Sequence, residues 1–133
     1  KFKKNISINY QNDGKSEYLI NGIENRIEQI IANLLDNSIS FSDDGSEVIV
    51  NVSNGLEKKV IVKILDEGKG FKEKDTSKIF NRFYSNRPEN FGEHSGLGLN
   101  IVKNLVELHD GKIEASNRLD KKGALIEIQF PSL

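Results

Sequence analysis

Apolar and polar residues alternate along several stretches of the chain, and this period of two predicts β-strands. Such a period places every second side chain on the same face of a strand. The stretches are residues 5–10, 48–52, 60–64, 112–116 and 124–130, with residues 18–20 as a shorter candidate. Asn54 and Gly55 lie between the second and third stretches, and this dipeptide favours a hairpin. The last two stretches are also predicted to pair as a hairpin.

Two longer stretches have the period of an amphipathic helix instead. Apolar residues recur at intervals of three and four over residues 24–41 and again over residues 96–109. The first pattern ends at the Asp-Asp-Gly-Ser of residues 43–46, and the second ends at the Asp-Gly of residues 110–111. We therefore predict a helix in each stretch.

Residues 67–95 are rich in glycine and charge and have no period, apart from a short helical piece over residues 76–83. A long irregular stretch inside a compact domain is usually a functional loop or a lid. Strands and helices interleave, but the hairpins argue against an all-parallel sheet. We therefore predict one α/β domain over residues 1–133, in which a mixed sheet packs against helices on one face.

The composition excludes several classes of function. A net charge of -1 gives no electrostatic reason to expect nucleic acid or an anionic membrane as a partner. The absence of Cys excludes a disulfide, a thiolate nucleophile and a Cys-ligated zinc site. No apolar run approaches the roughly 20 residues that span a membrane. Because the chain contains no Met, we expect it to be a piece of a longer protein.

Asn33 and Asn37 are the first candidates for a binding site. They are four residues apart on a predicted helix, so their amides project from neighbouring positions on one face. Amide oxygens suit Mg2+, which prefers oxygen ligands in the company of phosphates. The alternative is that both residues are solvated surface amides.

Asp66 follows the predicted strand that includes residues 60–64, and Gly68 and Gly70 come directly after it. A carboxylate at a strand end is placed to accept a hydrogen bond from an exocyclic amine such as that of adenine. The glycines would let the backbone approach the base closely. The alternative is a tight turn with Asp as a turn residue.

Glycines also gather at the start of the second predicted helix. The free N–H groups and the dipole of a helix N-terminus favour phosphate. The predicted phosphate-binding turn comprises Ser95, Gly96, Leu97, Gly98 and Leu99. It is not a P-loop, because no Lys-Ser or Lys-Thr follows the glycines. The alternative is a flexible loop with Ser95 as the N-cap.

Aromatic and basic residues interrupt the irregular stretch. Phe80 and Phe83 are predicted to pack in the core beneath a loop. Arg82 and Arg87 are candidates for bidentate contacts with phosphate oxygens, which would make them catalytic residues. The alternative is that both arginines are solvated surface charges.

In this order, the motifs closely resemble those of the catalytic, ATP-binding domain of bacterial sensor histidine kinases. That domain belongs to a superfamily shared with DNA gyrase, MutL and a class of heat-shock chaperones. Residues 33–38 resemble its N box, 66–70 its G1 box, 79–84 its F box and 92–99 its G2 box. Residues 38–42, 82–88 and 93–96 are in addition similar to the envelope-sensing kinases of the ChvG type. The resemblance covers essentially the whole chain.

The resemblance implies the Bergerat fold, a two-layer α/β sandwich. In this fold a mixed, mostly antiparallel sheet packs against about three helices, and residues 72–95 would form a mobile ATP lid. The implied roles are Mg2+ binding for Asn37 and Asn33, adenine recognition for Asp66, and shaping of the base pocket and phosphate turn for Gly68, Gly70, Gly96 and Gly98.

Three positions depart from relatives in the superfamily. Ser40 and Ser85 stand where many sensor kinases carry a basic residue, which leaves Arg82 or Arg87 to supply the charge at the phosphates. Asn33 stands where gyrase-like ATPases carry a Glu that activates water. Without that base, hydrolysis is expected to be slow.

Phosphoryl transfer can instead rely on positioning, with the nucleophile supplied by another domain. The resemblance implies that this nucleophile is a His on a preceding dimerisation domain. Neither His94 nor His109 has the context of that phosphoacceptor, and His109 fits a helix C-terminal cap.

The implied function is that of an enzyme, a sensor histidine kinase domain that binds Mg-ATP. It would donate the γ-phosphoryl group to the His of its dimerisation domain, for relay to an Asp of a response regulator. The chain would be a cytoplasmic domain of an inner-membrane sensor kinase, meeting the membrane only through other regions, and would not autophosphorylate alone. The alternatives are a serine kinase of the anti-sigma-factor type and a degenerate, non-catalytic partner-binding module.

Overall fold

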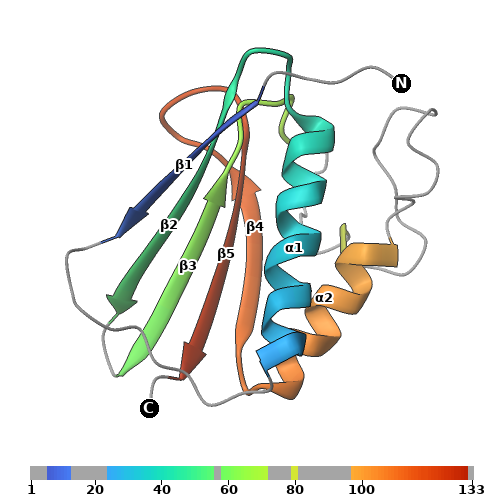
Figure 1. Cartoon of the computed structure of the whole chain (residues 1–133), viewed down its shortest axis with the longest axis vertical. Helices are drawn as coiled ribbons and strands as arrows, with labels where there is room; N and C mark the ends of the chain where they lie inside the picture. The colour runs from blue at the N-terminus through green and yellow to red at the C-terminus, as the bar shows by residue number, and fades with distance from the viewer. Residues whose placement is uncertain (1–5, 13–23, 56–57, 72–78, 81–96, 132–133) are drawn as a thin grey trace.

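The computed structural model describes residues 6–12, 24–55, 58–71, 79–80 and 97–131 of the 133-residue chain. Within them, a five-stranded sheet carries two helices on one face (Figure 1). The elements are β1 (Ser7–Asn12), α1 (Glu24–Phe41), β2 (Glu47–Gly55), β3 (Lys59–Leu65), α2 (Leu97–Leu108), β4 (Lys112–Asn117) and β5 (Ala124–Pro131). None of the helices in these ranges is long and apolar enough to cross a membrane.

The sheet is mixed, with the strand order β1-β2-β3-β5-β4. β1 pairs with β2 in parallel, and the other neighbouring strands pair antiparallel. Val50 lies opposite Ile64 in the hairpin of β2 and β3, so the apolar residues of both strands share one face. The predicted mixed, mostly antiparallel sheet and both predicted hairpins are confirmed. The predicted place of Asn54 and Gly55 in the connection is wrong, because both belong to β2 and pair with the start of β3.

The predicted helices are confirmed nearly to the residue. The first strand begins and ends about two residues later than predicted, at Ser7–Asn12 rather than residues 5–10. Of the short helix predicted over residues 76–83, the structure describes only Ile79 and Phe80, which form a single 3₁₀ turn. The candidate strand over residues 18–20 lies outside the described residues.

The core lies between the sheet and the two helices. Ile30 and Leu34 of α1 and Val102 and Val106 of α2 are each fully buried. Full burial of such a side chain contributes about 1.5–3 kcal/mol. Phe80 is also buried, which confirms its predicted place in the core, whereas Phe83 lies outside the described residues. The hydrophobic period of the helices therefore decides which face meets the sheet.

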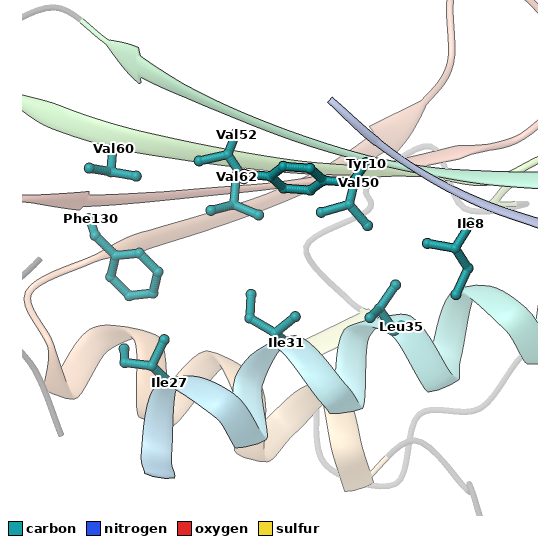
Figure 2. Close-up of a pocket in the computed structure, with 10 residues that line it drawn as sticks. All are labelled: Ile8, Tyr10, Ile27, Ile31, Leu35, Val50, Val52, Val60, Val62 and Phe130. Atoms are coloured by element: carbon teal, nitrogen blue, oxygen red, sulfur yellow. The ribbon is translucent and has the colours of Figure 1, made fainter. Parts of the chain in front are cut away.

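An apolar cavity of about 440 Å³ separates part of α1 from the sheet (Figure 2). Ile27, Ile31 and Leu35 face it from α1, opposite side chains of the sheet. The lining from the sheet is Ile8, Tyr10, Val50, Val52, Val60, Val62 and Phe130. Of the predicted site residues that the structure describes, none lines this cavity.

α2 ends in a Schellman motif. The Gly111 N–H donates to the Val106 carbonyl at 2.9 Å, and the Asp110 N–H donates to the Glu107 carbonyl at 3.0 Å. Asp110 itself takes the left-handed conformation, with φ of 60°. His109 is buried, and its Nδ1 lies 2.8 Å from the Leu105 carbonyl oxygen. The predicted capping position of His109 is thereby confirmed.

Candidate nucleotide site

Asp66 is held at the end of β3 by the neighbouring strand and its own turn. Its Oδ1 accepts hydrogen bonds from the N–H of Gly68 at 2.9 Å and of Ala124 at 3.1 Å. Its backbone N–H donates to the Ala124 carbonyl at 3.0 Å. The residue is only 4% exposed. These bonds fix one oxygen of the carboxylate and therefore the plane of the group.

The second oxygen of Asp66 is left available. Both side-chain hydrogen bonds end on Oδ1, so Oδ2 accepts none from the described residues. Every buried side-chain polar atom in those residues has a partner, which means that Oδ2 is not sealed from solvent. Burial raises the pKa of Asp66, against the N–H bonds of Gly68 and Ala124 and the charge of Arg118, which lower it. The result is an oriented carboxylate with one open acceptor.

Gly68 brings this carboxylate to the end of α1. A Cβ atom on Gly68 would overlap the carbonyl oxygen of Phe41, the last residue of the helix. The segment after β3 therefore runs directly against the end of α1, at the top of Figure 1. Gly70 has a φ of 78°, a conformation that favours glycine. The glycines predicted to shape a pocket thus permit a close approach and a left-handed turn.

Asn33 and Asn37 lie one turn apart on α1, near this junction. Asn37 is 5% exposed and Asn33 is half-buried, which argues against the alternative of two freely solvated amides. The hydroxyl of Ser40 donates to the Asn37 carbonyl at 2.9 Å, so its side chain turns back on its own helix. Because a serine is uncharged and this hydroxyl is directed to its own helix, position 40 supplies no cation to a ligand.

α2 packs beside α1 on the same face of the sheet and runs in roughly the opposite sense (Figure 1). It begins at Leu97, so Leu97 and Gly98 of the predicted turn are its first residues. Leu99 is 6% exposed and packs in the hydrophobic core, which leaves only its backbone for a ligand. Ser95, Gly96, Arg82, Arg87, His94 and the predicted lid over residues 72–95 lie outside the described residues.

The structure also reveals contacts around Asp66 that the motifs did not predict. Arg118 donates to the Asp66 carbonyl at 3.0 Å, and Asn117 binds the backbone of Phe71. Glu67 accepts from the Glu47 N–H at 2.9 Å and from Lys121 at 3.0 Å. The only sequence signal for these contacts was Asp120 two residues after Arg118. This spacing is too common in proteins to indicate a functional site.

Ionisable groups of the described residues do not form a separate metal centre. No group of three or more His, Asp or Glu side chains in that part of the chain is placed to hold a metal ion.

Hydrogen bonds from Lys121 and from the Glu47 N–H lower the pKa of Glu67. Its negative charge thus serves to join β2, β3 and the loop before β5.

Comparison with known proteins gives the same result as the motifs. The family of histidine kinase-, DNA gyrase B- and HSP90-like ATPases matches residues 22–133. The sensor protein ChvG of Agrobacterium fabrum is 38% identical over 96% of this chain, which spans 22% of that protein. The ChvG of Rhizobium meliloti is 35% identical over 92% of the chain, again 22% of the relative.

Solved structures agree in fold. The mycobacterial sensor histidine kinase MprB superposes with a TM-score of 0.79 at 25% identity, over 96% of this chain and 82% of that one. Full-length ShkA, solved in complex with AMPPNP, gives 0.78 at 25% identity, over 96% of this chain and 26% of that one. The chain belongs to the histidine kinase-, DNA gyrase B- and HSP90-like ATPases, and its Bergerat-type fold is that of sensor histidine kinase catalytic domains.

Proposed function

We propose that this chain binds Mg-ATP and donates the γ-phosphoryl group to a histidine of a dimerisation domain in the same sensor kinase. The phosphoryl group then passes to an aspartate of a response regulator. The observation that carries the proposal is the Asp66 carboxylate, oriented through Oδ1 and open at Oδ2, beside the helix end that bears Asn37. The match to AMPPNP-bound ShkA supports it, since AMPPNP is an analogue of ATP.

Asp66 recognises adenine through its open oxygen. The exocyclic amine of adenine is a donor, and Oδ2 is an acceptor whose position is already set by the two bonds to Oδ1. The hydrogen-bonded geometry limits the reorganisation that binding requires. Gly68 and Gly70 let the backbone after Asp66 pack against Phe41 and Asn117, which sets the shape of the base pocket.

Asn33 and Asn37 hold Mg2+ at the phosphates. Their amide oxygens match the preference of Mg2+ for oxygen ligands, and their burial keeps them in defined positions. When bound, Mg2+ neutralises charge that develops on the transferring phosphoryl group. Gly98 in the first turn of α2, with Ser95 and Gly96 that precede the helix in the sequence, binds the phosphate oxygens through backbone N–H groups. Arg82 or Arg87 supplies the cation that Ser40 does not.

Asn33 also favours transfer of the phosphoryl group to another nucleophile over transfer to water. It occupies the helical turn before Asn37, and an amide cannot act as a general base toward water. The site therefore favours transfer to a nucleophile brought by another domain. The chain spans 22% of the length of its ChvG relatives. The dimerisation domain, the response regulator and a membrane anchor for this cytoplasmic domain are therefore proposed for the whole protein.

The Asp66→Asn variant tests base recognition. Its Oδ1 can keep both backbone hydrogen bonds, which places the donor Nδ2 opposite the adenine amine. We expect ATP affinity to fall by about ten- to a hundredfold, the worth of a charge-assisted hydrogen bond. Affinity for ITP should be unchanged or rise, because its base carries an acceptor at that position and can accept from Nδ2. Asp110→Asn, at an exposed carboxylate, is the matched control.

The Asn37→Ala variant tests the metal. We expect loss of the Mg2+-dependent part of ATP binding, measured by titration of a fluorescent ATP analogue with and without Mg2+. Asn104→Ala, at an exposed amide on α2, is the control. Undiminished binding by both Asp66→Asn and Asn37→Ala would refute the site.

A further inference from the structure

Asn117, the last residue of β4, holds the backbone of Phe71 at two points. Its Oδ1 accepts from the Phe71 N–H at 2.6 Å, and its Nδ2 donates to the Phe71 carbonyl at 3.2 Å. These partners fix the orientation of the amide, because the N–H needs an acceptor and the carbonyl needs a donor. The side-chain amide thus pairs with the N–H and carbonyl of Phe71 as the backbone of a neighbouring strand would.

Arg118, the next residue, holds the other end of the same segment. Its Nη1 donates to the Asp66 carbonyl at 3.0 Å. Its Nε and Nη2 form a fork on the Asp120 carboxylate at 3.0 and 2.9 Å. The Arg118 side chain is only 3% exposed. A guanidinium is costly to bury unless its donors are satisfied, so this arrangement argues for a specific role.

The two contacts enclose the glycine-rich loop that follows β3. Asp66 and Phe71 are the first and last residues of residues 66–71, and Arg118 and Asn117 bind one each. Gly123 adds to the enclosure, because a Cβ there would overlap the Asp66 carbonyl oxygen. The loop from β4 to β5 therefore wraps the backbone of Asp66, while its carboxylate stays free at Oδ2.

We propose that Asn117 and Arg118 are positioning residues that preorganise the loop over residues 66–71 for recognition of the adenine amine. The proposal rests on the proposed function of Asp66. Neither residue needs to touch the nucleotide. Both fix the backbone that aims the carboxylate, and small displacements of an acceptor weaken a directional hydrogen bond. Contacts with the triphosphate, made by α1 and α2, lie outside their influence.

The test compares ATP with ITP, which differ at the exocyclic group and the adjacent N1 of the base and share ribose and triphosphate. The Kd of each is measured by calorimetry for the 133-residue chain and for Asn117→Asp, Arg118→Met and Arg118→Lys. Asn117→Asp keeps the acceptor for Phe71 and loses the donor. Leu119→Ser, on the same loop and fully exposed, is the matched control.

We expect Asn117→Asp and Arg118→Met to weaken ATP binding by about tenfold, the effect of one hydrogen bond, and to weaken ITP binding by less than about twofold. The ratio of the ITP Kd to the ATP Kd should therefore fall by about fivefold or more in both variants. It should fall less in Arg118→Lys, which keeps one donor. Leu119→Ser should match the parent chain.

Equal losses for ATP and ITP would overturn the proposal, because they would indicate a general structural role. An unchanged ATP preference in Asn117→Asp and Arg118→Lys would overturn it too, even if Arg118→Met failed to fold. The Asp66→Asn variant separates this failure from failure of the proposed function. If Asp66→Asn abolishes the ATP preference and the Asn117 and Arg118 variants keep it, Asp66 recognises adenine without the help of those two residues.

Discussion

Asp66 shows how a single residue is held for function at a cost to stability. Burial raises its pKa, so the folded state binds a proton more tightly than the unfolded chain does. Stability should therefore fall as the pH rises from the ordinary pKa of an Asp through the raised pKa of the folded state. Above that raised pKa the buried charge of Asp66 opposes folding, as is common where a site is shaped for binding.

Asp66→Asn should consequently unfold at a higher temperature than the parent chain at pH 7, although it binds ATP more weakly. The amide keeps the acceptor for Gly68 and Ala124 and removes the buried charge. Thermal unfolding measured from pH 3 to pH 8 provides the check. The advantage of the variant should shrink toward low pH, where Asp66 is protonated. A variant less stable than the parent at pH 7 would contradict this reasoning.

At the scale of elements, the loop after β3 packs tightly against the end of α1. Gly68→Ala would drive a Cβ into the carbonyl of Phe41, and a backbone atom cannot move aside as a flexible side chain can. We expect a loss of about 1–3 kcal/mol in the free energy of unfolding, together with weaker ATP binding.

Gly45→Ala is the comparison for that junction. Gly45 has a φ of 84°, but nothing lies within 4 Å of the Cβ position, so backbone strain is the only penalty. This strain is worth about 1–2 kcal/mol and should leave ATP binding unchanged. Urea unfolding and nucleotide titration of the two variants distinguish the effects. Loss of binding in Gly45→Ala, or normal binding in Gly68→Ala, would show that the junction does not shape the site.

At the scale of the whole molecule, the proposed nucleophile lies on a different domain. The 133-residue chain should therefore bind ATP, hydrolyse it slowly and acquire no phosphohistidine when given γ-labelled ATP. Label should appear on a histidine only after the dimerisation domain of the same protein is added. Acid-labile label on the chain alone would mean that His94 or His109 accepts phosphate and that the domain assignment is wrong.

Local patterns were enough to predict the elements of this fold. The period of apolar residues marked α1, α2 and the paired strands, because burial of one face is a property of consecutive residues. The Asp-Gly after α2 marked its end, although Asp110 rather than Gly111 has the positive φ. The order of the boxes also predicted Asn37, Asp66 and Gly68 as candidate site residues, since each motif is contiguous.

Sequence alone therefore determined the family and the elements and predicted the residues of the candidate site, all of which depend on short-range spacing. Tertiary structure alone decided that Asn117 and Arg118, some fifty residues beyond Asp66, hold both ends of its loop. The antiparallel pairing of β3 with β5 brings the loop before β5 against Asp66. A hydrogen bond from a side chain to a distant backbone atom leaves no period or motif in the sequence, because any residue can supply the backbone partner.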